Sequence, residues 1–446
     1  MAKYKAYPEY KDSGVEWLGE IPIHWEMLRH KYVAFFTKGK NPTNLLEQPL
    51  KNTLPYLSME CFRNNTTDKY ALISNDVRIA LEGQPLIIWD GSNAGEFVKG
   101  KSGILSSTMA AATLTYPLHP QYYWYLCISI EPEMRKNAVG MGIPHVNGDE
   151  LKSISFGIPS FCEQKQIAVF LDHETAKIDK LIKKQQQLIE LLKEKRQAVI
   201  SHAVTKGLNP DVPMKDSGVE WLGEVPEHWR VGRIKNYAKI ESGHTPSRTK
   251  PEYWVSCNIP WVSLNDSKQL KEVDYIEDTF YKISELGMAN SSAHLLPARA
   301  VVFTRDASIG LSAITTKSMA VSQHLIAWVC DEKFIIPEFL LLVFYAMEKE
   351  FERYTFGATI KTIGMDNVRG LKSTFPPVEE QHNLIDWAFN KIEKIKSSIS
   401  KVEDMLYLLQ ERRTALISAA VTGKIDVRDW VAPDTQDAEE PEEASA

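Results

Sequence analysis

The hydrophobic positions of this chain follow two periods, one suited to long helices and one suited to short strands. From residue 163 to 204, and again from 380 to 421, the chain contains no proline or glycine. In both stretches apolar residues return every three or four positions over about five heptads, which predicts a helix with a wide apolar seam. At 1.5 Å per residue each helix would be about 60 Å long. Such a seam requires a partner helix.

The residues expected on the pairing face occupy repeated heptad positions counted from Leu171 and from its counterpart in the second helix. They are Leu171, Ile178, Leu181, Leu188, Leu192, Val199, Ile395, Val402, Leu409 and Leu416. Prolines before both stretches, and Gly207 and Gly423 after them, mark the expected ends. The alternative is that each helix packs into the core of a separate domain. Two matched seams in one chain favour pairing with each other.

Outside these stretches the pattern changes to short apolar runs separated by clusters of Gly, Asn, Ser and Asp. Residues 85–89, 300–304 and 325–329 predict strands, whereas residues 121–129 and 337–352 predict helices. Each region is therefore predicted to be a mixed α/β globule rich in loops.

The chain also repeats itself. Residues 11–25 and 215–229 agree at thirteen of fifteen positions, and residues 191–205 and 408–422 agree at ten of fifteen. The offset between the copies grows from 204 to 217, so the second copy carries the longer body. Self-similarity of this kind indicates a repeated architecture. The plan of each copy is a short preamble, a variable body and a long closing helix.

This plan divides the chain into seven segments. They are an N-terminal preamble 1–27, a first body 28–158, a first long helix 159–207, a linker with the repeated preamble 208–231, a second body 232–375, a second long helix 376–424 and an acidic tail 425–446. From Asp429 onward the tail holds seven acids and no base, and without them the net charge of −6 becomes about +1. We expect this tail to be disordered; docking a partner or mimicking nucleic acid are the alternatives.

Composition narrows the class of protein. The 446 residues are 43% hydrophobic, which suits two or three folded domains and excludes wholesale disorder. The five cysteines are scattered without a C-x-x-C pair, which argues against a zinc ribbon or a disulfide framework and suits a reducing compartment. The polar N-terminus lacks a signal peptide, and no apolar run is long enough to span a membrane. We expect a cytoplasmic protein with no membrane partner.

One motif suggests nucleotide chemistry. Residues 95–102 match G-x-x-x-x-G-K-S, the phosphate-binding loop, and an ATP-dependent protein is therefore a rival hypothesis. That loop needs a strand directly before it, small residues inside it and a helix starting at Lys-Ser. Here Phe97 and Val98 are bulky, and residues 103–107 start a helix poorly. A basic loop facing DNA or a plain surface turn suits the segment better. No other catalytic motif and no metal site is predicted.

Four motifs occur in the same order in both copies: the preamble GVEWLGE-(I/V)-P-x-HW, the turn WDGSNAG or FTRDASIG, the segment GIPHVN or GATIKTIG, and a Pro…Glu-Gln entry into the long helix. With them, almost the whole chain apart from the acidic tail resembles the specificity subunit of type I restriction–modification systems.

The resemblance implies an α+β fold with two tandem mixed α/β target-recognition domains. Each domain would be followed by a long helix, and the two helices would pair as an antiparallel coiled-coil spacer with pseudo-two-fold symmetry. Each domain would read one half of a bipartite site in double-stranded DNA, with half-site centres roughly 10 base pairs apart. A rival hypothesis is a coiled-coil adaptor that joins proteins without touching DNA.

The resemblance also implies the partners of the chain. Two methyltransferase subunits carrying S-adenosylmethionine would dock on this frame, and motor–nuclease subunits using ATP and Mg²⁺ would join for cleavage. This chain would bind no cofactor and would have no catalytic residue.

Base reading needs Arg, Lys, Asn, Gln, Ser, Thr or His on loops. The candidate DNA-contacting residues are Arg63, Asn64, Asn93, Lys99, Lys101, Ser107 and His145 in the first body, and His244, Arg248, Asn265, Arg305, Ser308, Gln323, Thr359 and Lys361 in the second.

Overall fold

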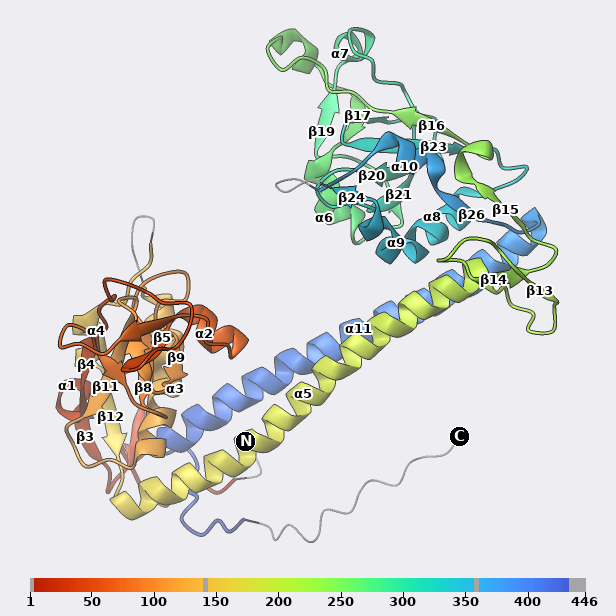
Figure 1. Ribbon diagram of the computed structural model, residues 1–446. Coiled ribbons are helices and arrows are strands. Elements are labelled where there is room, and N and C mark those ends of the chain that lie inside the picture. The colour runs from red at the N-terminus through yellow and green to blue at the C-terminus, as the bar shows by residue number, and fades with distance from the viewer. Residues whose placement is uncertain (1–3, 139–142, 357–360, 433–446) are drawn as a thin grey trace. The chain divides into compact units, whose positions relative to one another are not determined.

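The computed structural model describes residues 4–138, 143–356 and 361–432. They form two compact units, which we call unit 1 (Met1–Gln185 with Asp404–Ala446) and unit 2 (Gln186–Glu403). Each unit combines one body with one part of each long helix (Figure 1).

The two long helices are α5, Phe161–Thr205, and α11, Val378–Val421. Two residues after the end of each helix stands a glycine in the left-handed region, Gly207 after α5 and Gly423 after α11, both with φ of 73°. A residue with a Cβ would be strained there, so these glycines end the helices as the sequence predicts. The α5 helix begins in unit 1 and ends in unit 2, and α11 does the reverse.

In unit 1 the two helices pack antiparallel. The ring of Phe170, near the start of α5, lies 5.2 Å from that of Trp430, beyond the end of α11. Further along α5, Asp179 accepts a hydrogen bond of 2.8 Å from Nε of Arg413. Residue numbers therefore rise along α5 while they fall along α11.

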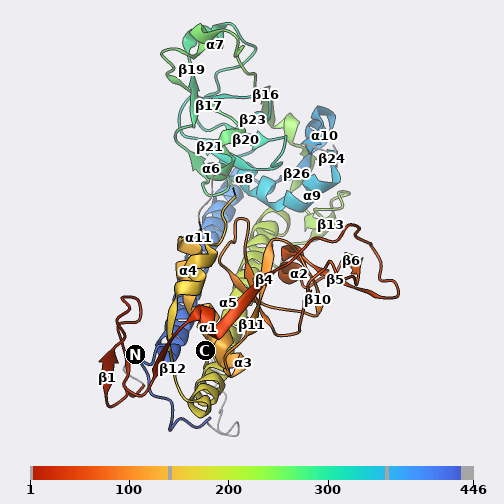
Figure 2. The same cartoon turned by 90° about the vertical axis from the view of Figure 1, so that its left-hand side faces the viewer.

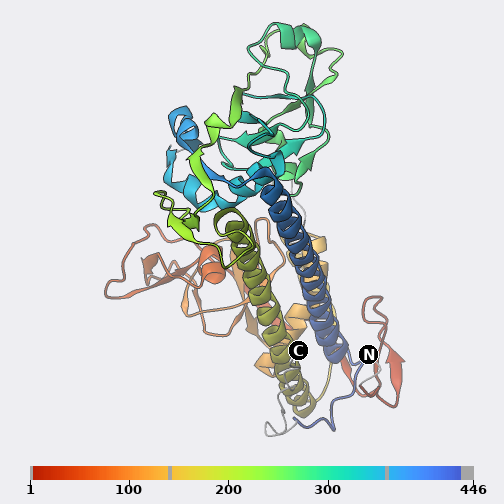
Figure 3. The same ribbon diagram turned by 90° about the vertical axis from the view of Figure 1, so that its right-hand side faces the viewer.

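Unit 2 repeats this arrangement with the other ends of the helices, which lie side by side in Figure 3. His202 of α5 faces Trp387 of α11 with ring centroids 5.9 Å apart. Gly207, five residues later, lies beside Glu380, which is seven residues earlier in α11. The helix pair is thus antiparallel in both units.

The pairing face differs from the predicted one in register at two places. Leu181 and Leu188 are 45% and 40% exposed, whereas the neighbouring Ile182 is packed on the unit 1 core and Ile189 is only 8% exposed. A step of one residue turns a side chain by about 100° around a helix, so only one of two adjacent apolar residues can face the partner. The predicted pairing of Leu181 and Leu188 is therefore wrong.

The other predicted pairing residues lie on the buried face. Four of them are buried: Leu171, Ile178, Ile395 and Leu416. The other four are half-buried: Leu192, Val199, Val402 and Leu409.

The body of unit 1 is built on two four-stranded sheets, ordered β4-β11-β8-β9 and β6-β5-β10-β7. The strands of these sheets are β4 Ala34–Lys38, β5 Thr53–Leu57, β6 Tyr70–Leu72, β7 Ile79–Ala80, β8 Pro85–Ile88, β9 Phe97–Lys99, β10 Gly103–Leu105 and β11 Met109–Leu114. Two small pairs complete the unit: β1 Tyr10–Asp12 with β2 Glu20–Pro22, and β3 Glu26–Arg29 with β12 Ser155–Ile158. Its short helices are α1 His30–Val33, α2 Met59–Asn64, α3 Pro120–Lys136 and α4 Gly148–Ser153.

Unit 2 has the same plan on a five-stranded sheet, β16-β23-β20-β21-β18, and a three-stranded sheet, β19-β17-β22 (Figure 2). The strands of these sheets are β16 Ala238–Ser242, β17 Ile259–Val262, β18 Tyr275–Ile276, β19 Tyr281–Ile283, β20 Val301–Thr304, β21 Ser312–Thr315, β22 Ala320–Val321 and β23 Leu325–Cys330. The small pairs are β13 Met214–Asp216 with β14 Glu224–Pro226, β15 Arg230–Arg233 with β26 Lys372–Phe375, and β24 Thr355–Phe356 with β25 Thr362–Ile363. Its helices are α6 Ser267–Leu270, α7 Glu285–Ala289, α8 Pro337–Ala346, α9 Glu348–Arg353 and α10 Met365–Gly370, with 3₁₀ turns η1 Ile234–Asn236, η2 Pro251–Trp254 and η3 Leu264–Asp266.

Alternate residues of the central strands feed two cores. In β11, Ala110 and Ala112 belong to the core shared with α3 and α5, whereas Met109 and Ala111 belong to a separate core on the opposite face. A strand turns successive side chains to opposite faces, so a strand buried on both sides reads as a continuous apolar run. β23 shows the same division between two cores. This explains the apolar runs of the sequence.

The repeated Glu-Gln pair has a structural role at the start of each long helix. In unit 1, Gln164 accepts a hydrogen bond from the His119 amide (2.8 Å) and donates one to the Pro159 carbonyl (3.0 Å). In unit 2, Gln381 makes the equivalent bonds with the Ile336 amide (2.9 Å) and the Pro376 carbonyl (2.9 Å). One side chain thereby connects the start of each long helix to the start of α3 or α8.

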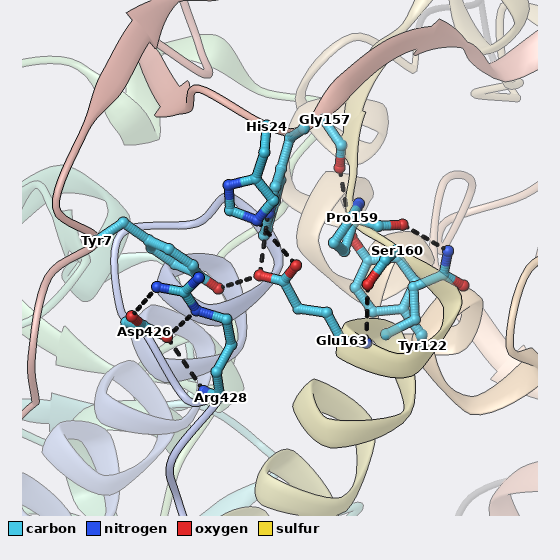
Figure 4. A network of polar contacts seen from close by, with 11 residues as sticks. Tyr7, His24, Tyr122, Gly157, Pro159, Ser160, Glu163, Asp426 and Arg428 are labelled. Carbon is cyan, nitrogen blue, oxygen red and sulfur yellow. Dashed lines mark hydrogen bonds and ion pairs between the residues drawn. The ribbon is translucent and has the colours of Figure 1, made fainter.

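The Glu of the pair organises the repeated preamble (Figure 4). Glu163, which is 6% exposed, accepts hydrogen bonds from Oη of Tyr7 (2.6 Å) and Nε1 of Trp25 (3.1 Å), and its other oxygen lies 3.0 Å from Nε2 of His24. The guanidinium of Arg428 covers the Tyr7 ring at 5.0 Å. Burial and the bond to Glu163 raise the pKa of Tyr7 above its ordinary value, so the phenol stays protonated and donates.

The second repeat contains only part of this network. Nε2 of His228 lies 2.9 Å from Glu380, but Asp211 stands where the repeat offset places the counterpart of Tyr7. Within the described residues, Nε1 of Trp229 is buried without a hydrogen-bond partner.

The prediction that the chain is disordered from residue 425 is wrong for residues 425–432. Ile425 and Val427 are 2% and 1% exposed, and the Asp426 amide donates to the Lys5 carbonyl at 2.7 Å. Alternating apolar residues in this short segment complete the unit 1 core, a signal that the acidic composition of the following residues obscured. The remainder of the predicted tail, 433–446, lies outside the described residues.

Candidate nucleic-acid interface

A tight turn leaves the central sheet of unit 1 directly after β8. Asp90 pairs antiparallel with His145, and the Gly91 amide donates to the Pro144 carbonyl at 2.9 Å. Gly91 has φ of 111°, a conformation that favours glycine. The turn thereby holds residues of two loops that are distant in the sequence together, at the place where β8 leaves the sheet.

Unit 2 builds the same turn after β20. Asp306 pairs antiparallel with Thr362, and the Ala307 amide donates to the Lys361 carbonyl at 2.8 Å. Ala307 has φ of 62°, although alanine disfavours this region, so its surroundings impose the conformation. The tight turn is therefore reproduced even where the sequence does not supply glycine.

The matching bonds align the two turns with an offset of 216, so Asp90 corresponds to Asp306. Each carboxylate has a partner on a neighbouring strand or loop. Asp90 forms an ion pair of 2.7 Å with Lys38 at the end of β4. Asp306 lies 2.7 Å from Nδ1 of His324, just before β23, and accepts a hydrogen bond from Oγ1 of Thr362.

A glycine beside each turn is required for close packing of the backbone. A Cβ on Gly39, directly after β4, would lie 2.1 Å from the Ser106 carbonyl oxygen. A Cβ on Gly243, directly after β16, would lie 2.1 Å from the Val321 carbonyl oxygen. These contacts press the ends of β4 and β16 against the loops that carry Ser107 and Gln323.

We define two turn clusters from these neighbours. The first turn cluster is Lys38, Asp90, Asn93, Ser107 and His145, and the second turn cluster is His244, Arg305, Asp306, Ser308, Gln323, His324, Lys361 and Thr362. Both contain mostly exposed or half-exposed polar side chains at the same edge of equivalent sheets. Eight of the residues predicted to contact DNA therefore lie in these clusters, three in the first and five in the second.

The other nominated residues lie elsewhere in their units. Lys101 donates to Asn65 at 2.6 Å and so joins Arg63 and Asn64 at the end of α2. The side chain of Lys99 donates to Gln121 of α3 at 3.0 Å. The backbone of Lys99 pairs with Pro85 at the start of β8, whereas Asp90 follows the end of that strand.

In unit 2, Arg248 and Asn265 are exposed outside the turn cluster, Arg248 beside Trp254 and Tyr281 and Asn265 in η3. Thr359 lies outside the described residues.

Sequence reasoning missed the two carboxylates and their partners Lys38, His324 and Thr362. The signal was available, because both turn motifs contain an aspartate followed two residues later by a serine, Asp90 with Ser92 in WDGSNAG and Asp306 with Ser308 in FTRDASIG. A carboxylate is a poor candidate for direct contact with a polyanion, but here the two carboxylates pair with the neighbouring donors Lys38 and His324.

The segment that matches a phosphate-binding loop has a different geometry. Its interior forms the strand β9, paired antiparallel with β8, and β10 follows it in place of a helix. A phosphate cradle needs consecutive amides curled around one point and a helix N-terminus behind them. The segment 95–102 is therefore a β-hairpin arm and carries no such cradle.

Among the described residues, no three His, Cys, Asp or Glu side chains are grouped closely enough to hold a metal ion. No helix in the same part of the chain is long and apolar enough to cross a membrane.

The sequence profile of a family described as the type I restriction modification DNA specificity domain matches the chain twice, at residues 22–191 and 226–400. The chain therefore belongs to this family of restriction–modification specificity proteins.

Relatives of the chain carry the same description. It is 27% identical over 414 residues to the type I restriction enzyme MjaVIII specificity subunit of Methanocaldococcus jannaschii, covering 92% of this chain and 94% of that protein. It is 26% identical over 197 residues to the type I restriction enzyme EcoR124I/EcoR124II specificity subunit of Escherichia coli, and the match covers 42% of this chain and 44% of that protein. A chain solved in a study of assembly and conformational transition of the type I R-M system shares the fold, with a TM-score of 0.67 and 15% identity. The match covers 91% of this chain and 99% of that chain.

The chain is thus a type I restriction–modification specificity subunit with two target-recognition domains, as the sequence predicted.

Proposed function

We propose that each turn cluster reads one half of a bipartite DNA site, the first cluster for one half and the second for the other. The observation that carries this proposal is the equivalence of the two turns, which share backbone pairing but differ in side chains. A shared frame gives both domains the same approach to a groove, and different polar side chains give each its own base preference. The half-sites are therefore expected to differ in sequence.

The paired helices would set the distance between the half-sites and dock the methyltransferase. Exposed apolar pairs occur at equivalent places on the two helices, Leu188 with Leu191 on α5 and Met405 with Leu408 on α11. Exposed leucines at repeated positions are a surface suited to a protein partner. Because the surface occurs twice, we propose that two copies of one methyltransferase subunit bind, one to each pair.

The chemistry would then belong to the partners. S-adenosylmethionine would be bound by the methyltransferase, and ATP with Mg²⁺ by motor–nuclease subunits, while this chain would contribute no catalytic group. Such a complex would act on chromosomal DNA in the cytoplasm.

A map of methylated adenines tests the proposal. Cells that make this chain with the methyltransferase of its operon are compared with cells that make the methyltransferase alone. We expect a split motif that appears only with this chain, which would give both half-sites and the gap between them. The absence of new methylation, with the methyltransferase folded and bound to the chain, would refute the recognition role.

A further inference from the structure

The second turn cluster contains an arginine whose hydrogen-bonding capacity is partly unused. Nε of Arg305 is buried and has no hydrogen-bond partner within the described residues. Its closest acid is Asp306, where Nε and Oδ1 are 3.6 Å apart, an ion pair longer than a hydrogen bond. A buried donor without a partner costs free energy, and the rest of the guanidinium has donors with which a ligand could pair.

The backbone of Arg305 is fixed, while its side chain remains 28% exposed. The Arg305 amide donates to the His324 carbonyl at 3.0 Å, and its own carbonyl accepts from the Ile363 amide at 2.9 Å. Asp306 is held in turn by His324 and Thr362. The guanidinium is therefore presented from a rigid turn, which reduces the entropy that it would lose on binding.

The first domain offers different chemistry at the same place. The offset of 216 aligns Arg305 with Trp89, whose carbonyl accepts from the Val146 amide at 2.9 Å as that of Arg305 accepts from Ile363. The Trp89 ring lies against α4, where a Cβ on Gly148 would be 3.2 Å from it. An indole has one N–H donor and cannot form a bidentate pair with a base edge, whereas a guanidinium can.

We propose that Arg305 reads a guanine in the half-site of the second domain, and that Asp306 is the residue that positions its guanidinium. The planar fork of arginine matches the O6 and N7 acceptors of guanine in the major groove, and the fixed backbone of the turn presents this fork from a constant position. This inference rests on the proposed function, because it assumes that the second turn cluster faces DNA. The exposed Lys361 beside it is suited to a phosphate.

The test is a binding experiment with the complex of this chain and its methyltransferase. Duplexes carry the site found in the methylation map, with each base pair of the second half-site replaced in turn. Affinities are measured for the wild type and for Arg305→Ala. We expect the wild type to prefer the native G·C pair at one position by about 10- to 100-fold, and Arg305→Ala to lose that preference at that position only.

Two further variants make the result specific. Arg305→Lys keeps the charge without the fork, so it should retain affinity at low salt and show a weaker guanine preference than the wild type. Asp306→Asn should weaken the preference for the same G·C pair and leave the other positions unchanged. Arg230→Ala, which removes an exposed arginine of the same unit at the start of β15, beside Pro376 and outside the turn cluster, should keep the full preference.

An equal loss of affinity of Arg305→Ala for every duplex would show a phosphate contact and overturn the proposal. So would a second half-site without a G·C pair, or an unchanged preference. Substitutions in the first half-site are the internal control, because their effects should be the same for wild type and variants. Failure of the proposed function is distinct, since no split motif would then depend on the chain at all.

Discussion

Nε1 of Trp25 donates a hydrogen bond of 3.1 Å to Glu163, 138 residues later in the chain. The same carboxylate accepts from Tyr7, so it joins the preamble to the start of α5 in unit 1. In unit 2 the equivalent Glu380 has His228 as its partner, and its side chain is 30% exposed against 5% for Glu163.

We therefore expect Glu163→Ala to destabilise unit 1 by about 2–4 kcal/mol, because it leaves buried donors of Trp25 and Tyr7 without an acceptor. The matched variant Glu380→Ala should cost less than about 1 kcal/mol in unit 2, since water can replace an exposed partner. Hydrogen exchange of amides in the two units measures both effects. Equal losses in the two variants would contradict the difference in burial.

His30 predicts a pH dependence confined to unit 1. Burial lowers the pKa of this histidine to about 4, and its ring contacts the Leu151 carbonyl and the Tyr123 hydroxyl. In the unfolded chain the pKa is about 6.5, so between pH 6.5 and 4 the unfolded state binds a proton that the folded state does not. Stability is therefore complete above pH 6.5 and falls by about 3 kcal/mol as the pH drops to 4.

Unfolding of unit 1, followed from pH 7 to pH 4, measures this loss. The repeat supplies the control, because Ile234 stands at the equivalent place in unit 2 and does not titrate. The variant His30→Ile should lack the loss of stability between pH 6.5 and pH 4 that His30 causes in the wild type. A variant with the same acid sensitivity as the wild type would show that other groups are responsible.

The register of the helix pair predicts opposite results for two adjacent residues of α5. Ile182→Asp would put a charge against the core of unit 1 and should cost about 2 kcal/mol or more. Leu181→Asp, at a side chain that is 45% exposed, should change stability by no more than about 0.5 kcal/mol. Chemical denaturation of the two variants decides between the observed register and one in which Leu181 faces α11.

The exposed apolar pairs predict a stepwise loss of partner subunits. Leu191→Asp and Leu408→Asp, both at side chains that are 61% exposed, should each remove one methyltransferase copy, and the double variant should remove both. Native mass spectrometry of the assembled complex counts the copies. Lys183→Asp, which adds an exposed acid elsewhere on α5, is the control and should keep both. Two copies bound to the double variant would exclude these surfaces.

Exchange of a whole body tests the assignment of one domain to one half-site. Replacing residues 28–158 with the corresponding domain of another family member should change one half of the methylated motif and leave the other half unchanged. A motif in which both halves change, or neither, would contradict the assignment.

The sequence by itself determined the repeated plan, both long helices and three strands of the central sheets, β8, β20 and β23. These features depend on local periods: three to four residues for the helical seam, and continuous apolar runs for strands buried on both faces. Gly207 and Gly423 end α5 and α11 because only a residue without a Cβ adopts their backbone conformation easily. Such properties are written in neighbouring residues.

Only the tertiary structure decided which of two adjacent leucine or isoleucine side chains faces the partner helix, as at Leu181 and Ile182. It also decided which nominated polar residues meet. Arg305, Gln323 and Lys361 lie together because backbone pairing connects loops that are distant in the sequence. Residue type shows that a side chain can contact DNA, but whether it stands beside a second donor depends on contacts between strands, which no local pattern encodes.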